Sequence, residues 1–525
     1  MKKQRVLLIA LVAMLSLVAL PVFSQGSKDT AAATGPVTIE LWYGAAVTEA
    51  GPPPADWVGF DIIKEKLNID LKLTALPSNE SDQDVKIQAA AAANNLPDLF
   101  MVRRDVLGRL VGQGLVASVD DLYAKMPVRT ATHYDSVSQS HARFNGKSYG
   151  LADPGSINKN EGLLIRKDWL DNLGLSVPTT LDELMTVMHA FTYNDPDGNG
   201  KNDTYGYGAF QEVNNYEAWP GRRLEPLFGA FGVDGTWSMR AEDPGLMVLK
   251  SEFYDAMTFL KKMVDDGVMD PNWLAYKKDD FRAAWKQGRF GVMREQNAAF
   301  AAESNYAPFD KNFPNGEWII VDAPVGPNGH ASIGPYTASF RIYAISAKAE
   351  KAGKKDKIAE LLEWMASDEG YYLLGWGVEG VNYTLDKNGV PVADGVANRD
   401  LAFSGPVGQT VTQLRNMVFY NGDIELLARY PKYTTATSKK EMSALDVLRV
   451  MQTKEWTAAV GSDTLPIANA DLKRFYEQGL SEFITGKRVL NKANWDKWIE
   501  EFKKLGGQSW NDAGVAFAKE NSLLI

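Results

Sequence analysis

The sequence predicts an α/β fold built from more than one lobe, and three observations support this prediction. The chain has 525 residues, several times the usual size of one domain, so we expect at least two compact lobes. Its residues are 45% hydrophobic and 23% charged, which is the composition of a globular protein rather than a disordered one. Apolar strands and amphipathic helices alternate between residues 37 and 102, an order typical of α/β units.

Residues 1–24 have the pattern of a secretory signal peptide. Basic residues open this segment, and the apolar run from Val6 to Leu20 is shorter than the roughly 20 apolar residues that a membrane helix needs. We expect residues 25–36, which are rich in Gly, Ser, Thr and Ala, to form a flexible leader. The sequence has no cysteine that could carry a lipid after the signal, so we expect an unanchored protein in a periplasm.

Charge, cysteine content and motifs narrow the class of protein. The net charge of −10 argues against nucleic acids and anionic membranes as partners, because no chain-wide basic field exists to attract them. The absence of cysteine excludes disulfides, thiolate nucleophiles, zinc–thiolate sites and iron–sulfur clusters. The four histidines form no HExxH pair, and the sequence has no GxSxG elbow, GxGxxG loop or Walker A motif. These absences agree with a protein that has no catalytic residues, but they do not prove it.

The first α/β units can be followed residue by residue. Residues 37–43 (VTIELWY) predict a strand, residues 56–67 a helix with apolar residues at helical spacing, and residues 69–75 a second strand. Residues 81–95 predict an alanine-rich helix that ends before a proline, and residues 99–102 (LFMV) a short apolar strand. This order implies a parallel sheet with right-handed crossovers.

A parallel sheet also predicts where a ligand binds. In open α/β sheets, ligands bind beyond the carboxyl ends of the strands. Trp42 and Tyr43 stand at the end of one predicted strand, and Arg103, Arg104 and Asp105 follow another. We therefore expect these five residues to line a ligand-facing rim.

Later segments predict helices with buried faces. Thr180 and Glu183 have the spacing of a capping box, with Thr180 as the N-cap of a helix. Residues 253–264 and 358–365 carry apolar stripes at helical spacing, which we assign to the core. Residues 495–505 carry another such stripe, and the two glycines that follow predict the end of that helix.

Residues 195–203 (DPDGNGKND) have the spacing of a calcium loop. With Asp195 as position 1, oxygen-bearing side chains fall at positions 1, 3, 5 and 9, a carbonyl is available at position 7, and a glycine occupies position 6. Position 12 is Gly206 where a glutamate is expected, so further ligands must come from elsewhere, from water or from Thr204. The alternative is a surface turn rich in Asp and Asn. The predicted ligands of a structural Ca²⁺ are Asp195, Asp197, Asn199, the carbonyl of Lys201 and Asp203.

Several segments, in this order, resemble one known family. They are TIELWYG at 38–44, NNLPDLFMV at 94–102, NGKSYGL at 145–151, RKDWLDNLGLSVPTTLDEL at 166–184, the loop at 195–203, GRFGVM at 288–293, ASDEGYYLLGWGVEGVNYTLD at 366–386 and FITGKRVLNKANWDKWIEEFKKLGG at 483–507. With them the chain resembles the family 1 extracellular solute-binding proteins, the ligand receptors of bacterial ABC importers. The likeness is greatest to the branch that binds oligosaccharides such as alginate fragments, in which the matching loop holds a structural calcium.

The resemblance implies a two-lobed periplasmic-binding fold, type II-like, with a ligand cleft between the lobes. Closure of the lobes on a ligand would create the surface that a membrane permease recognises. We expect a monomer whose chain crosses between the lobes more than once. The expected division is residues 37–152 in lobe 1, 153–277 in lobe 2, 278–338 back in lobe 1, and 339–525 mainly in lobe 2 with the C-terminal helices.

Aromatic and polar residues in turns or at strand ends are the candidate ligand contacts. Carbohydrate sites place flat aromatic rings against the apolar faces of sugars, while polar groups bond the hydroxyls. The sequence has 14 tryptophans; those on helical stripes, Trp169, Trp364, Trp495 and Trp498, are assigned to packing. The candidate ligand-binding residues are Trp42, Tyr43, Arg103, Trp219, Arg294, Gln296, Trp376 and Glu379.

Three arginines of the sequence have two possible roles. Arg103, Arg294 and Arg341 could bond sugar hydroxyls or pair with a sugar carboxylate. Each could equally form an ion pair with a neighbouring acid. By the resemblance, the GRFGVM strand returns to the first lobe and brings Arg294 and Gln296 to the cleft.

Taken together, these features predict a non-enzymatic receptor that captures an oligosaccharide and delivers it to an ABC permease. One alternative is a secreted polysaccharide-degrading enzyme, which needs two facing carboxylates. Another is a receptor of the same fold for a peptide or another small organic solute.

Overall fold

The computed structural model describes most of the chain. The described residues are 35–44, 53, 55–77, 80–128, 130, 142–152, 159–210, 221–233, 235–336, 342–392, 414, 417, 422–458, 469–520 and 524. The chain divides into Met1–Pro36 and Val37–Ile525, and every element below belongs to the second unit. The predicted signal peptide and nearly all of the leader lie outside the described residues. Within the described residues, no helix is both long enough and apolar enough to cross a membrane.

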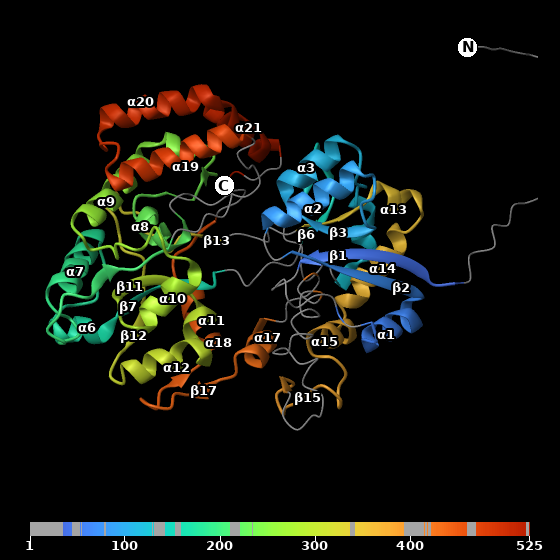
Figure 1. Cartoon of the computed structure of the whole chain (residues 1–525), viewed down its shortest axis with the longest axis horizontal. Coiled ribbons are helices and arrows are strands. Elements are labelled where there is room, and N and C mark those ends of the chain that lie inside the picture. Colours follow the sequence, from blue (N-terminus) through green and yellow to red (C-terminus); the bar gives the residue numbers. More distant parts are fainter. Residues whose placement is uncertain are drawn as a thin grey trace, which may run out of the picture. The chain divides into compact units, whose positions relative to one another are not determined.

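The first lobe contains a five-stranded sheet in the order β2-β1-β3-β14-β6. Figure 1 labels β1, β2, β3 and β6 of this sheet. β1 (Val37–Gly44) runs parallel to β2 (Ile69–Leu76) and to β3 (Leu99–Val102). β14 (Ile342–Ile345) is antiparallel to β3 and to β6 (Leu151–Ala152). The three predicted strands of this region are confirmed, and their ends differ by at most one residue from the prediction.

Helices of the first lobe share one hydrophobic core with this sheet. All four residues of β3 are buried, as expected for a strand covered on both faces. Ile63, Leu107 and Leu361 of the helices pack in one cluster with Leu41 and Leu99 of the strands. The helices are α1 (Val58–Leu67), α2 (Glu80–Ala92), α3 (Arg104–Gly112), the 3-10 helix η2 (Asp120–Lys125), α13 (Ala347–Lys351), α14 (Lys355–Met365) and α15 (Asp368–Trp376).

The second lobe is built on a four-stranded sheet in the order β12-β7-β11-β8. β7 (Glu161–Arg166) is buried along its whole length. β11 (Phe290–Gln296) and β12 (Trp318–Val321) flank it in antiparallel register. β8 (Tyr205–Tyr207) runs parallel to β11 on the outer side.

This pairing differs from the expected division of the chain. We expected residues 278–338 to return to the first lobe, but β11 and β12 both pair with β7 in the second sheet. The chain re-enters the first sheet at β14, and α13 to α15 stay with the first lobe's core. Residues 342–376 therefore belong to the first lobe, although we expected residues 339–525 to belong mainly to lobe 2. A local apolar pattern predicts a strand but not its partner, because pairing depends on contacts distant in sequence.

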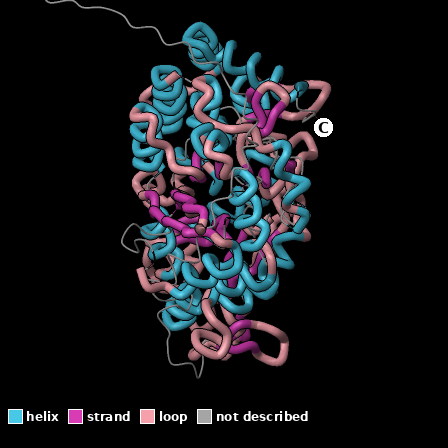
Figure 2. The backbone as a smooth tube through the Cα atoms, turned by 90° about the vertical axis from the view of Figure 1, so that its right-hand side faces the viewer, coloured by secondary structure: helices cyan, strands magenta, loops and turns pink. Residues whose placement is uncertain are grey.

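Helices also cover the second sheet, and helices make up far more of the backbone than strands, as Figure 2 shows. They are α6 (Lys167–Asn172), α7 (Leu181–Tyr193), η3 (Arg222–Leu224), α8 (Glu225–Gly229), η4 (Met247–Leu249), α9 (Ser251–Asp265), α10 (Lys278–Lys286), α11 (Asn297–Ala301), α12 (Glu303–Asn312), α18 (Ala444–Gln452), α19 (Ala470–Thr485), α20 (Lys492–Phe502) and α21 (Gln508–Glu520).

Short strands and one further helix complete the described elements. They are β4 (Arg143–Phe144), β5 (Lys147–Ser148), β9 (Trp237–Ser238), β10 (Gly245–Leu246), β13 (Pro335–Tyr336), β15 (Thr384–Leu385), β16 (Pro391–Val392), α17 (Gly422–Arg429), β17 (Tyr433–Thr434), β18 (Glu441–Met442) and β19 (Thr457–Ala458).

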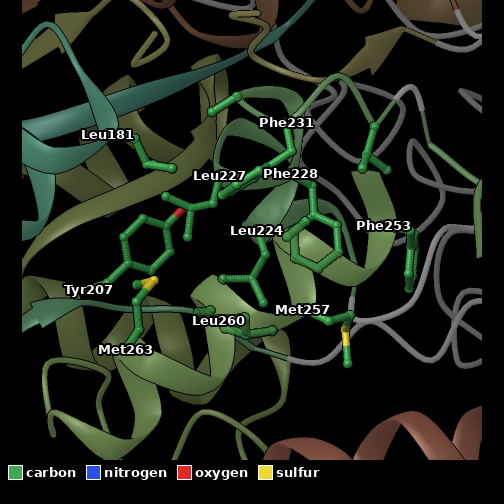
Figure 3. Close-up of a cluster of buried hydrophobic side chains, with 14 of the residues drawn as sticks. Leu181, Tyr207, Leu224, Leu227, Phe228, Phe231, Phe253, Met257, Leu260 and Met263 are labelled. Carbon is green, nitrogen blue, oxygen red and sulfur yellow. The ribbon is translucent and has the colours of Figure 1, made fainter. Parts of the chain in front are cut away.

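The core of the second lobe joins elements that are far apart in the sequence. Figure 3 shows Leu181 of α7, Tyr207 of β8, Phe228 of α8 and Phe253 of α9 within one cluster of buried side chains. The predicted capping box of α7 is confirmed, because the Thr180 hydroxyl accepts a hydrogen bond from the Glu183 N–H at 3.2 Å and the Glu183 carboxylate accepts from the Thr180 N–H at 3.1 Å. This cap fixes the point at which α7 begins.

The helix predicted over residues 495–505 ends at the predicted glycines, and a second helix begins directly after them. Gly506 has a φ of 118°, which produces a kink, and Gly507 leads into α21. The residues after the kink are again helix formers with an apolar face, so the chain resumes as a helix. Trp169, Trp495 and Trp498 are buried, which confirms their assignment to packing.

Candidate functional site

Each sheet has one edge at which the chain passes to the other sheet. In the first sheet, this edge holds the carboxyl ends of β1 and β3, the end of β6 at Ala152 and the start of β14 at Ile342. In the second sheet, it holds the start of β7 at Glu161, which pairs with the end of β11 at Gln296. Ligands of open α/β sheets bind beyond the carboxyl ends of the strands. Ligand-binding side chains are therefore expected at these two places, the first-lobe edge and the second-lobe edge.

Trp42 is a half-buried residue of the first-lobe edge. Its indole Nε1 donates a hydrogen bond to Glu40 Oε1 at 2.9 Å. The ammonium group of Lys86, on α2, lies 4.8 Å from the centroid of the indole ring. The ring is therefore held in place by a hydrogen bond and a cation–π contact, and part of it stays accessible.

Tyr43 and Arg103 belong to the same edge, but Tyr43 is buried and Arg103 is paired with an acid. Tyr43 is fully buried, and burial raises the pKa of its phenol. Arg103 follows β3 and pairs with Asp84 of α2, with Nε 3.2 Å from Oδ1. Its guanidinium group is thus neutralised by a neighbouring acid, which is the ion-pair reading left open by the sequence.

Arg294, on β11, is at the centre of a group of buried charges behind the second-lobe edge. Its Nη1 lies 2.7 Å from the carboxylate of Glu161 and 2.7 Å from that of Glu225. The same nitrogen donates to the backbone carbonyl of Arg222 at 2.8 Å. Only 2% of Arg294 is exposed, so its charge is committed to protein groups.

Two further arginines extend this group of charges. Arg223 lies 3.5 Å from the Glu161 carboxylate and 3.3 Å from that of Glu295. Arg282 Nε donates to Glu295 at 3.0 Å. Each of the three glutamates therefore has at least one arginine partner. The charge cluster is defined as Glu161, Arg223, Glu225, Arg282, Arg294 and Glu295.

The charge cluster changes the titration of Glu161. Burial by itself would raise the pKa of Glu161, but the guanidinium groups of Arg294 and Arg223 outweigh it and hold that pKa below its usual range. Glu161 is therefore an ionised carboxylate at neutral pH. An ionised, arginine-paired carboxylate is a poor donor of a proton to a glycosidic oxygen.

Trp456 lies against one member of the charge cluster, Arg294. Its ring centroid lies 5.7 Å from the guanidinium carbon of Arg294. The indole is half-buried, and its Nε1 donates to the carbonyl of Met451 at the end of α18, at 3.0 Å. An aromatic ring thus lies against the buried arginine at the second-lobe edge.

Sequence reasoning missed Trp456 and the partners of Arg294. Glu161 pairs with both Arg294 and Arg223. It is 62 residues from Arg223 in the sequence, so no local pattern joins these residues. The one available signal was the position of Glu161 immediately before the apolar run GLLI, which marks it as the start of a buried strand. Gln296 is half-buried at the end of β11, as predicted for an edge residue. Trp219 and Arg341 lie outside the described residues.

Trp376 and Glu379 lie at the end of α15, beside a small aromatic cluster. Trp376 is 4% exposed, and its ring lies 5.3 Å from Tyr371 and 5.8 Å from Tyr372. Tyr372 is half-buried and stacks on Tyr383, with centroids 6.0 Å apart. Glu379 is exposed, and its backbone forms a β-bridge with Tyr383. Burial and the nearby Glu379 carboxylate raise the pKa of Tyr383 to about 12. The accessible ring of this cluster is therefore Tyr372 rather than Trp376.

The predicted calcium loop folds around its own acidic side chains. The N–H groups of Asn199 and Gly200 donate to the Asp195 carboxylate at 3.0 and 2.9 Å. The amide nitrogen of Asn199 donates to both Asp197, at 2.8 Å, and Asp203, at 3.2 Å. The three carboxylates of the loop thus converge on one short segment. Burial raises the pKa of Asp197, and Asp195 and Asp203 raise it further.

These donors suit a hard cation, which prefers oxygen ligands. The set combines the three carboxylates with the Asn199 side chain and the Lys201 carbonyl. In the described part of the chain, no group of three or more His, Cys, Asp or Glu side chains is arranged so that it could hold a metal ion. Mixed donors from the loop would therefore be needed.

Gly206 explains the missing glutamate at position 12. Its N–H donates to Thr192 at 2.9 Å, and a Cβ added there would lie 2.5 to 2.7 Å from Met188. No side chain fits, because the loop leads into β8, packed on α7, rather than into a second helix. Thr204 is buried and donates to the carbonyl of Phe191 at 2.8 Å.

The loop and the second-lobe edge lie at opposite ends of the second sheet. Tyr205, at the start of β8, pairs with Phe290, the first residue of β11. The charge cluster lies at the other end of β11, around Arg294. At about 3.3 Å per residue, the 7 residues of β11 separate the two ends by about 20 Å. A cation in the loop would therefore stabilise the lobe without contacting a ligand at the edge.

Comparison with known proteins agrees with this architecture. The model of the bacterial extracellular solute-binding protein family matches residues 46–372. The polygalacturonan/rhamnogalacturonan-binding protein YtcQ of Bacillus subtilis is 29% identical over 397 residues, which cover 73% of this chain and 74% of YtcQ. Lipoprotein LipO of Bacillus subtilis is 25% identical over 450 residues, covering 83% of this chain and 84% of LipO.

Solved structures share the fold at low sequence identity. An extracellular solute-binding protein of Bifidobacterium longum subsp. infantis superposes with a TM-score of 0.68 and 16% identity, covering 93% of this chain and 99% of the other. FusA of Streptococcus pneumoniae, an ABC-transporter substrate-binding protein solved as an EF-hand mutant with fructo-nystose, superposes with a TM-score of 0.60 and 17% identity over 93% and 99% of the two chains. The two-lobed α/β fold expected from the sequence is confirmed.

Proposed function

Because the chain belongs to the bacterial extracellular solute-binding protein family, we propose that it captures an oligosaccharide outside the cytoplasm and delivers it to the permease of an ABC importer. The observation that carries the proposal is the presence of a half-buried tryptophan at each lobe's ligand-facing edge, Trp42 in the first lobe and Trp456 in the second. Aromatic faces of this kind bind the apolar faces of sugar rings. YtcQ, which is named for binding polygalacturonan and rhamnogalacturonan, matches 73% of the chain.

We further propose that the protein is not an enzyme. A glycosidase needs one carboxyl group that is protonated and can act as an acid, and a second carboxylate facing it. The buried glutamates of the second-lobe edge are instead paired with arginines, and the pKa of Glu161 is held low. This arrangement supports binding without cleavage.

The test is a binding experiment in which the sugar is recovered. The protein without its predicted signal peptide is titrated calorimetrically with neutral oligosaccharides and with oligogalacturonides, and each mixture is then chromatographed. We expect saturable binding of one class with the sugar unchanged. Cleavage of the bound sugar would overturn the receptor proposal, and binding of a peptide or another organic solute in place of every sugar would overturn the carbohydrate assignment.

Two finer proposals concern the cation and the location. We propose a structural Ca²⁺ held by the oxygen ligands of the 195–203 loop, which supports the second lobe from the end opposite the edge. We also propose export by the N-terminal signal and an unanchored periplasmic location, although the relative LipO is named a lipoprotein. Cell fractionation followed by N-terminal sequencing tests the location: a mature start near residue 25 supports it, and recovery with the membranes contradicts it.

A further inference from the structure

We propose that Arg104 of the first lobe and Phe517 of the second lobe form a clasp that stabilises one arrangement of the two lobes. The guanidinium carbon of Arg104 lies 4.5 Å from the centroid of the Phe517 ring. Arg104 is the first residue of α3, and Phe517 belongs to α21 near the end of the chain. The inference rests on the proposed receptor function, in which the lobes move, and assigns part of their resting equilibrium to this pair of residues.

The second lobe fixes the position of Phe517. Earlier in α21, Asn511 Oδ1 accepts a hydrogen bond from the Leu246 N–H of β10 at 2.8 Å. The ring of Trp510 lies edge-on to that of Trp237 in β9, with centroids 5.3 Å apart. Phe517 itself is half-buried and packs against the same hydrophobic core. The helix that carries this ring therefore belongs to the second lobe.

The first lobe fixes the position of Arg104, which directly follows β3. Its Nη2 donates to the backbone carbonyl of Arg143 at 3.1 Å. Its guanidinium carbon lies 4.3 Å from the centroid of Phe144. The sequence predicted Arg104 at the ligand-facing rim, but only 6% of the residue is exposed. The guanidinium group thus contacts one aromatic ring from each lobe.

Burial determines how much the clasp contributes. Burial lowers the pKa of the Arg104 guanidinium to about 9, so the group is desolvated but still charged at neutral pH. Cation–π contacts are strongest when the cation has lost its water. When the lobes change their arrangement, Phe517 is withdrawn from Arg104 and this contact is lost. A contact of this kind shifts an equilibrium between two arrangements by about 10-fold.

The clasp is coupled to ligand binding through the arrangement of the lobes. A ligand shifts an equilibrium between two arrangements only to the extent that it binds one of them more tightly. If the ligand favours the arrangement in which the clasp is formed, the clasp raises the ligand affinity. If the ligand favours another arrangement, the clasp lowers it.

The first experiment measures the lobe arrangement without a ligand. The chain has no cysteine, so Glu65→Cys on α1 and Asp255→Cys on α9 provide one exposed dye position in each lobe. Single-molecule fluorescence energy transfer then compares Phe517→Ala with the unchanged protein. We expect the ratio of lobe arrangements to change about 10-fold. The matched control is Phe475→Ala, a half-buried phenylalanine that stacks on Trp498 within the second lobe; it should leave the ratio unchanged.

Two further variants separate the clasp from a general loss of packing. Phe517→Tyr keeps the aromatic face, so its distribution should match that of the unchanged protein. Arg104→Met removes the cation and should shift the ratio in the same direction as Phe517→Ala. The double variant should shift it no further, because both substitutions remove one contact. Melting temperatures are measured in parallel, so that unfolding is distinguished from a change of arrangement.

The second experiment adds a saturating amount of the neutral oligosaccharide or oligogalacturonide that binds best. If the sugar leaves the energy transfer of the unchanged protein as it was, the sugar and the clasp favour the same arrangement, and Phe517→Ala should bind up to about 10-fold more weakly. If the sugar moves the energy transfer, the clasp opposes binding, and Phe517→Ala should bind more tightly. A change of affinity with the opposite sign would overturn the clasp.

The outcomes separate this inference from the proposed function. If ligand-free Phe517→Ala has the same distribution of arrangements as the unchanged protein, the clasp is wrong while the receptor proposal stands. If no sugar binds the unchanged protein, the receptor proposal fails, and a shifted distribution in ligand-free Phe517→Ala still supports the clasp.

Discussion

The two ends of the second sheet both gather carboxylates, but they neutralise them in different ways. At the carboxyl end of β11, Glu161, Glu225 and Glu295 are each paired with an arginine of the same lobe. At its amino end, the aspartates of the 195–203 loop have backbone N–H groups and one asparagine amide as partners. One group of acids is balanced within the chain, and the other is only hydrogen-bonded.

This difference shows how a cluster of acids can be interpreted. Burial raises the pKa of Asp197, and the like charges of Asp203 and Asp195 raise it further; a cation bound among them would reverse this effect. Acids that already have arginine partners keep a low pKa, as for Glu161, and do not require an ion from solution. Counting acidic residues in the sequence does not separate the two cases, whereas the partners seen in the structure do.

The largest expected effect is a loss of stability when an arginine is removed from the charge cluster. Arg294→Met removes the cation shared by Glu161 and Glu225 and leaves two buried carboxylates, so the free energy of unfolding should fall by roughly 3–5 kcal/mol, measured by urea unfolding. Arg474→Met is the control, because its pair with Asp471 is exposed and should contribute less than about 1 kcal/mol. Equal losses in the two variants would contradict the role of the charge cluster.

The second expected effect is stabilisation of the protein by Ca²⁺ bound in the 195–203 loop. If the loop binds Ca²⁺ only in the folded state, calcium at about 100 times its dissociation constant should stabilise the protein by about 2.7 kcal/mol over chelator. The melting temperature is measured in calcium, in magnesium and in chelator, for the unchanged protein and for Asp195→Asn. A melting temperature that does not respond to calcium would rule the cation out, and an unchanged response in Asp195→Asn would place it elsewhere.

A smaller effect tests why the loop lacks its twelfth-position glutamate. Gly206→Ala should cost about 2 kcal/mol, since the new Cβ would meet Met188 at 2.5 Å and force β8 away from α7. Gly112→Ala, at the end of α3 with no atom within 4 Å of the new Cβ, should be neutral or slightly stabilising. Thermal unfolding of the two variants makes the comparison. A harmless Gly206→Ala would remove the packing explanation.

The smallest effect is a difference in acid sensitivity. The pKa of Glu161 is lower in the folded protein than in an unfolded chain, so its contribution is present above the unfolded value of about 4.3 and is lost as the pH falls through the folded value. The melting temperature of Glu161→Gln should therefore decline less steeply than that of the unchanged protein as the pH is lowered below about 4.5. Asp471→Asn, at an exposed site, serves as the control, and parallel slopes for all three proteins would show that Glu161 carries no such linkage.

The sequence best predicted those features that depend on a few neighbouring residues. The strand at Val37–Gly44 and the capping box at Thr180 follow from patterns of a few residues, and both were predicted. The partner of β11 was not predicted, because alternating or apolar residues do not encode which strand lies alongside. The helix end at Gly506 was predicted as well, but the second helix that begins at Gln508 was not.

In the candidate site, too, local patterns predicted positions along the chain but not contacts between distant segments. Trp42 and Gln296 lie half-buried near the ends of strands, as predicted, and their contact with a ligand stays a prediction. Arg294 was predicted as a ligand contact, but it is buried and paired with Glu161 and Glu225. These pairs could not be predicted, since they join segments that meet only in the folded lobe. Trp456 lies after a helix and before a two-residue strand, a context without any pattern that marks a ligand contact.

The strand that follows the loop has a consequence for what a bound cation could do. In calcium sensors, the glutamate at position 12 draws the following helix when the ion binds, and the helix opens a surface. Here that position is Gly206, bonded to Thr192 and packed against α7, so there is no movable helix for an ion to pull. Occupancy would change how often the lobe opens to attack by proteases and hence how long the protein survives outside the cytoplasm, without changing when it takes up or releases its cargo.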